Sequence, residues 1–190
     1  MTTPHTFPLL GEPLALDLVN TRVRRDGVDT DLLDRPATLD RWLRAEASRV
    51  DWSGRACPAD LAAVRALRDA MDPLLRAYVA RGRGPIAAIR KLNGALVVAG
   101  PQTTLAWGKT GPRKVPPVGH DRLAALLRQL AASALDLLTG PDSSHLRRCA
   151  HPDCVLLFVA RDPRRRWCSD AICGNRARVA RHYLRHRRIV

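Results

Sequence analysis

Two pairs of cysteines near the end of the chain constrain its fold more than any other feature. Cys149 and Cys154 are separated by four residues, and Cys168 and Cys173 repeat that spacing after thirteen intervening residues. Two thiolates at this spacing can approach one metal ion from a single turn, and zinc prefers four such ligands in a tetrahedron. The pattern therefore predicts one structural Zn²⁺ ion held by all four cysteines. Because no coordination position stays open for water, zinc-dependent hydrolysis is not expected.

A different ligand set is conceivable, because two histidines four residues apart share a helical face. It would consist of Cys168, Cys173, His182 and His186. This set would leave the first cysteine pair without a metal, so the four-cysteine site is favoured. His151 is expected to lie beside the site, and Cys57, the odd cysteine, is predicted to be a packing residue.

The charge of the chain is concentrated beside these cysteines. The net charge is +14 with a pI of about 11.1, and residues 147–190 carry +9 against +5 for residues 1–146. The electrostatic field of this much positive charge attracts polyanions. No apolar stretch reaches the ~20 uncharged residues of a membrane span, and the first ten residues lack a signal-peptide pattern. We therefore expect no membrane partner and a cytoplasmic, nucleoid-associated location, where reducing conditions favour a metal over disulfides.

The segment after Gly174 has the spacing of a helix. At 100° per residue, Ala177, Ala180, Tyr183 and Leu184 share one arc with Arg176, and this arc is predicted to pack on the zinc hairpin. Arg176 is thus expected to support the finger structurally, together with Asn175. The opposite arc would be positive. Phosphate contacts are predicted for this arc and for the expected tip of the zinc hairpin, at Arg178, Arg181, Arg185, Arg188, Arg164 and Arg165.

Before the cysteines, the chain is predicted to be rich in helices. Residues 14–22 alternate with a period near two and predict a strand, in which Asp17 is a solvated or turn-pairing carboxylate. Helices are expected over residues 38–48, 58–82 with a kink or break at Pro73, 85–96 and 121–138. Further strands are expected at residues 103–107 and near 115, where they could pair with residues 14–20. Trp42, Met71, Tyr78, Ile86, Ile89, Leu92 and Leu96 are predicted core residues.

These elements predict an α+β fold in two units. Residues 1–140 would form a helix-rich N-terminal domain with a small antiparallel sheet. Residues 146–190 would form a C-terminal treble-clef-like zinc finger, with a hairpin tip at residues 161–166 and a helix that starts at the last cysteine.

Several motifs closely resemble a known bacterial architecture. The run Cys173-Gly-Asn-Arg176, preceded by Arg166-Trp-Cys168, resembles the CGNR zinc-finger family. Residues 14–21, Leu92-Asn93 and the helix at 123–140 are similar to the ABATE domain that precedes that finger. The resemblance implies a stress-induced transcriptional regulator with zinc on the four cysteines.

The function expected from the sequence is therefore DNA binding by the finger, with an N-terminal domain that senses an unknown small-molecule effector or forms a homodimer. RNA is disfavoured because few aromatic residues are available for stacking. Two alternatives stay open. The N-terminal domain could bind a small molecule or catalyse a reaction, with candidates Asp17, Asn20, Arg22 and His120, although no set of nucleophile, base and orienting group can be assembled. The basic helix could instead dock an acidic protein.

Overall fold

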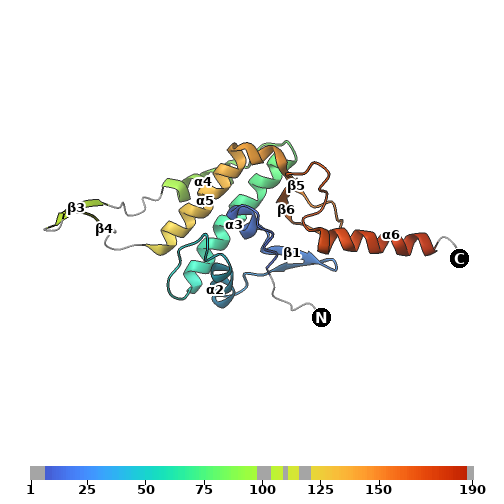
Figure 1. Ribbon diagram of the computed structural model, residues 1–190, viewed down its shortest axis with the longest axis horizontal. Helices are drawn as coiled ribbons and strands as arrows, with labels where there is room; N and C mark the ends of the chain where they lie inside the picture. The colour runs from blue at the N-terminus through green and yellow to red at the C-terminus, as the bar shows by residue number, and fades with distance from the viewer. Residues whose placement is uncertain (1–6, 98–103, 109–110, 116–120, 188–190) are drawn as a thin grey trace.

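In the computed structural model, three long helices form the body of the protein (Figure 1). The structure describes residues 7–97, 104–108, 111–115 and 121–187. Helices α3 (Pro58–Val79), α4 (Ile86–Val97) and α5 (Arg122–Thr139) pack against one another. The short α1 (Leu14–Val19) packs against α3 and α5, and α2 (Pro36–Ala45) packs against α3. The helix-rich N-terminal region predicted from the sequence is confirmed.

The long helices begin where the sequence supplies caps. Asp121 accepts hydrogen bonds from the backbone N–H groups of Leu123 and Ala124, both at 3.0 Å, at the start of α5. At the start of α3, the backbone N–H of Cys57 donates to Asp60 at 2.8 Å. Cys57 is exposed at this N-cap position, so the prediction that it is a packing residue is wrong. Helix α3 runs through Pro73 without a break, because the buried leucines that follow hold it in the core.

Residues 14–19 form helix α1, so the predicted strand is wrong. All six residues of α1 are buried, including Asp17 at 1% exposure. A helix that is buried all round has no polar face, and a short apolar run of this kind does not distinguish helix from strand. The prediction that Asp17 is solvated fails for the same reason.

The strands form three separate two-stranded antiparallel sheets within the described residues. Strands β1 (Arg22–Arg25) and β2 (Val28–Asp31) join at the Asp26-Gly27 turn. Strands β3 (Thr104–Gly108) and β4 (Gly111–Val115) pair with each other and project from the body (Figure 1). They do not pair with residues 14–20, of which residues 14–19 are helical. Strands β5 (Leu146–Arg148) and β6 (Leu157–Val159) belong to the finger.

The predicted core is only partly correct. Trp42 and Met71 are fully buried, whereas Tyr78 is 40% exposed and Ile86 and Ile89 are 68% and 42% exposed. Helix α4 turns a narrow face with Ala88 and Leu92 toward its neighbours. Leu92 is buried as predicted, whereas Ile86 and Ile89 lie outside the covered face of α4.

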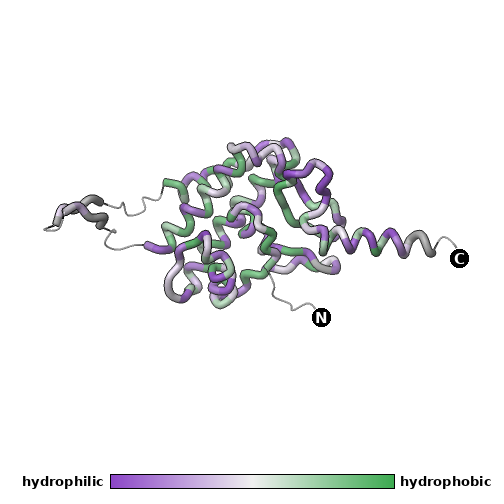
Figure 2. Tube along the Cα trace, in the orientation of Figure 1, coloured by the Kyte–Doolittle hydropathy of each residue, from purple (hydrophilic) through white to green (hydrophobic). Residues whose placement is uncertain are grey.

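The finger shares its core with the N-terminal helices. Leu146, Leu157 and Val159 belong to the same hydrophobic cluster as α1, α3 and α5. A second cluster joins Val23 and Leu32 to Phe158 and the four cysteines. Figure 2 shows the apolar segments inside this joint body, whereas the projecting α6 (Asn175–Arg187) is mainly hydrophilic.

Candidate metal centre

The four predicted ligands meet at one point. The Sγ atoms of Cys149, Cys154, Cys168 and Cys173 all lie within 4.8 Å of one another, and all four residues are buried. The Cys154–Cys168 and Cys168–Cys173 Sγ separations are 3.9 and 3.5 Å. A tetrahedral ion with Zn–S bonds of ~2.3 Å needs sulfur separations of about 3.8 Å. The cluster therefore fits one zinc ion and leaves no protein-defined open position.

The pKa shifts of these thiols also favour a bound cation. Hydrogen bonds from Cys154 and Cys168 lower the pKa of the Cys149 thiol. Burial, together with the charge on Cys154, raises the pKa of Cys173 to about 12. Four thiolates in this small buried volume repel one another, so full ionisation requires a compensating positive charge. A bound zinc ion would supply that charge and would tie the two cysteine pairs together.

The first cysteine pair lies in the loop that joins β5 to β6. The backbone N–H of Cys149 donates to the carbonyl of Leu156 at 3.0 Å, which closes this loop. Strand β6 pairs with the strand before Cys149 and not with the chain near Trp167. The hairpin predicted with its tip at residues 161–166 is therefore wrong, because β6 finds its partner in the residues that enter the site.

The second cysteine pair leads into helix α6 through a tight turn, η2 (Asp170–Gly174). A Cβ atom at Gly174 would lie 2.8 Å from Asp170 Oδ1 and 3.2 Å from Trp167 Cδ1. Only glycine fits there without a shift of its neighbours.

His151 lies beside Trp167, with ring centroids 6.5 Å apart, and its Nδ1 accepts a hydrogen bond from the Asp153 backbone at 3.2 Å.

Asp153, inside the first cysteine loop, connects three parts of the protein. Its carboxylate accepts hydrogen bonds from the backbone N–H groups of Asp26 and Gly27 in the β1–β2 turn, both at 2.9 Å. It also accepts one from Arg176 Nη2 at 3.0 Å. Arg176 thereby joins the first turn of α6 to the zinc loop and to the N-terminal region. Asn175 is exposed, and its side chain has no hydrogen bond within the described part of the chain.

Arg165 is half-buried, and its guanidinium is engaged by other groups of the protein. Its guanidinium donates to the carbonyl of Cys168 at 2.6 Å and to Glu12 Oε1 at 3.2 Å, and it lies over the Phe158 ring at 4.6 Å. Glu12 is buried and also accepts from the Val159 backbone at 2.8 Å. Burial raises the pKa of Glu12. The sequence indicated neither role, since Arg165 lies in an arginine run and Glu12 lies in an apparent turn.

The candidate ligand pocket of Asp17, Asn20 and Arg22 is replaced by three separate contacts. Asp17 is paired with Arg49. The Asn20 amide donates to the Leu157 carbonyl at 2.9 Å and accepts from the Leu157 N–H at 3.0 Å, so it ties α1 to the finger. Arg22 pairs at the surface with Asp69 at 2.9 Å. His120, the further candidate, lies outside the described residues.

Helix α6 projects away from the finger (Figure 1). Ala177 is half-buried, but Ala180 is exposed and Tyr183 is 68% exposed. For Ala180 and Tyr183, the prediction that this arc packs on the zinc hairpin is therefore wrong, because η2 directs the helix into solvent. The side chain of Leu184 lies outside the described residues. Arg178 and Arg181 are exposed on α6, and Arg164 is exposed in the loop before Trp167. The Arg185 side chain and Arg188 lie outside the described residues.

These features define a zinc-finger protein: a closed four-cysteine centre holds the start of an exposed basic helix against a helical domain.

Comparison with protein families agrees with this class. Residues 12–141 match the ABATE model, described as "putative stress-induced transcription regulator", and residues 145–186 match the CGNR zinc finger. The chain belongs to the ABATE family and carries a CGNR zinc finger. No curated protein matches it. Among the described residues, no helix is long and apolar enough to cross a membrane.

Proposed function

We propose that the protein is a zinc-dependent, non-catalytic transcriptional regulator whose finger binds DNA through α6, in the cytoplasm at the nucleoid. The observation that carries this proposal is the exposure of α6. The helix is anchored at the zinc site by Arg176, and its side chains from Arg178 to Tyr183 are all exposed. A basic helix that is fixed at one end and exposed from Arg178 to Tyr183 can enter a groove without any rearrangement.

The dimensions of α6 suit the major groove. Its 13 residues span about 20 Å at 1.5 Å per residue, and a helix ~10–12 Å across fits a groove ~12 Å wide. Arg178 and Arg181 would contact phosphates or guanine edges. Val179 and Tyr183, which are 45% and 68% exposed, offer apolar contacts to thymine methyl groups.

The phosphate contacts predicted for the loop before Trp167 are best assigned to Arg164. Arg164 is exposed, whereas Arg165 is engaged by Glu12 and by backbone carbonyls. Arg185 and Arg188 stay in the proposal on sequence grounds alone. The zinc ion itself would have a structural role, because four thiolates leave no position for a water molecule on the metal.

The test is DNA binding by the full zinc-loaded chain as a function of salt, measured by fluorescence anisotropy with random genomic fragments. The slope of log affinity against log salt should become shallower by about 0.9 in Arg164→Gln, Arg178→Gln or Arg181→Gln, because each variant neutralises one phosphate fewer. Arg44→Gln removes the same charge from an exposed site on α2 and should leave the slope unchanged.

Two results would overturn the proposal. One is the absence of any complex at low salt, which would favour an acidic protein as the partner of α6. The other is an equal loss of affinity in Arg44→Gln and in the α6 variants, which would mean that net charge and not the helix determines binding.

A further inference from the structure

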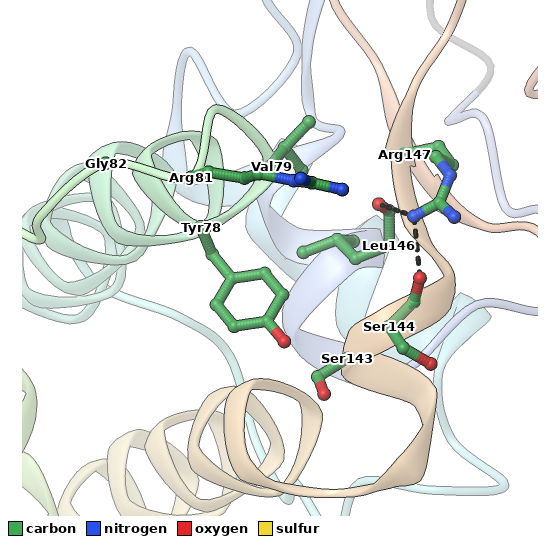
Figure 3. A pocket seen from close by; sticks show the side chains of 8 residues that line it. All are labelled: Tyr78, Val79, Arg81, Gly82, Ser143, Ser144, Leu146 and Arg147. Carbon is green, nitrogen blue, oxygen red and sulfur yellow. Dashed lines mark hydrogen bonds between the residues drawn. The ribbon is translucent and has the colours of Figure 1, made fainter.

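One cavity lies where the N-terminal helices meet the finger. Its volume is about 680 Å³. One wall is the C-terminal end of α3 and the residues that follow it, and the other is the 3-10 helix η1 (Pro141–His145) with the start of β5 (Figure 3). The lining residues are Tyr78, Val79, Arg81, Gly82, Ser143, Ser144, Leu146 and Arg147.

The polar lining of this cavity suits an anion. Arg81 and Arg147 approach it from opposite walls (Figure 3), and neither pairs with a carboxylate of the described residues. Arg76, by contrast, is paired with Asp72 at 2.9 Å. Arg147 uses one nitrogen to donate to the carbonyls of Ser144 and Leu146, at 2.7 and 2.9 Å, which fixes its side chain at the cavity. Two guanidinium groups without a counter-charge favour a ligand that supplies one.

The cavity also has an apolar side. Leu146, at the start of β5, belongs to one wall and is 2% exposed. The Tyr78 ring faces the same space, and its hydroxyl group points toward Ser143. This explains the partial exposure of Tyr78, whose ring belongs to a cavity wall and not to the core. Ligand sites commonly combine such apolar surface with a few convergent polar groups.

We propose that this cavity binds a small organic anion, with a carboxylate or phosphate group between Arg81 and Arg147 and an apolar body against Leu146 and Tyr78. This site is distinct from Asp17, Asn20 and Arg22, and it does not depend on the DNA-binding proposal.

The two walls of the cavity are connected through the protein to the metal centre. Arg147 lies in β5, two residues before the zinc ligand Cys149. Arg81 and Tyr78 lie at the end of α3, whose Arg76 donates to the Val155 carbonyl at 3.0 Å, next to Cys154. An anion held by Arg81 and Arg147 would join the two walls and hold the finger against the N-terminal helices.

The experiment is calorimetric titration of the full zinc-loaded chain with benzoate, which carries one carboxylate on an apolar ring. Benzyl alcohol, which has the ring without the charge, serves as the ligand control. Benzoate is expected to bind and benzyl alcohol is not. Arg81→Gln and Arg147→Gln should each weaken benzoate binding by about tenfold or more, because each removes a charged hydrogen-bond donor.

A matched protein control comes from Arg83→Gln, because Arg83 is exposed, lies two residues from Arg81 and does not line the cavity. This variant should bind benzoate as the original chain does. The proposal is overturned if benzoate does not bind at millimolar concentration while circular dichroism shows a folded chain. It is also overturned if Arg83→Gln weakens binding as much as Arg81→Gln does, since benzoate would then be responding only to net charge.

Discussion

Replacing Asn20 by alanine tests whether the finger and the N-terminal helices form one folding unit. The Asn20 amide makes two hydrogen bonds to the backbone of Leu157, and both residues are buried, at 1% and 0% exposure. No other described side chain takes these two bonds. Asn20→Ala would therefore leave a buried N–H and a buried carbonyl of β6 unpaired.

The expected loss follows from these two groups. A buried polar group without a partner costs ~1–3 kcal/mol, so the free energy of unfolding should fall by about 2–6 kcal/mol. The total stability of a domain is only ~5–15 kcal/mol, so this is a large fraction of it. The urea midpoint should fall by about 1 M or more.

The assay is urea unfolding followed by tryptophan fluorescence and circular dichroism, with the same zinc concentration for every variant. Asn93→Ala is the control, because Asn93 is exposed on α4 and its replacement should change stability by less than ~0.5 kcal/mol. If Asn20→Ala loses no more stability than Asn93→Ala, Asn20 does not hold the finger and the reasoning is refuted.

Further outcomes are expected from pH, from the arginine run and from the metal. Burial raises the pKa of Asp17 from 3.8 to about 6, so the folded chain holds a proton that the unfolded chain releases between these values. The contribution of Asp17 to stability should thus fall by about 3 kcal/mol as pH rises through this window, and urea unfolding of Asp17→Asn should show a flatter pH profile. Arg165→Ala should lower the thermal midpoint by several degrees, whereas Arg164→Ala should leave it unchanged; equal midpoints would contradict the internal role of Arg165. Fresh protein should contain one zinc per chain by elemental analysis, and chelation should lower the thermal midpoint of the whole chain, since Leu157 and Val159 share its main core.

The residues that carry local chemistry were identifiable from the sequence. Equal spacing in the two cysteine pairs predicted the metal cluster, because short loops limit where their thiols can lie. Helical spacing predicted α3, α4 and α5. These signals come from neighbours in the chain, so they hold before any tertiary contact forms.

Other predictions failed where burial decided the outcome. Residues 14–19 are helical because they are enclosed on all sides, and an enclosed helix loses the periodicity that identifies it. Ile86 and Ile89 have helical spacing, but the buried face of α4 contains Ala88 and Leu92 instead. Helical periodicity shows that a helix has an apolar face, but it does not show whether another element covers that face.

The sequence by itself thus determined the zinc ligands, most of the helices and the basic character of α6. Only the tertiary structure decided which charges are available to a partner. Arg164 and Arg165 are adjacent and identical in type, yet one is exposed and the other binds Glu12, 153 residues away in the chain. The same packing turns α6 into solvent and places Arg81 and Arg147 on opposite walls of one cavity. Contacts of such long range depend on how whole elements pack, and no local pattern of residues encodes them.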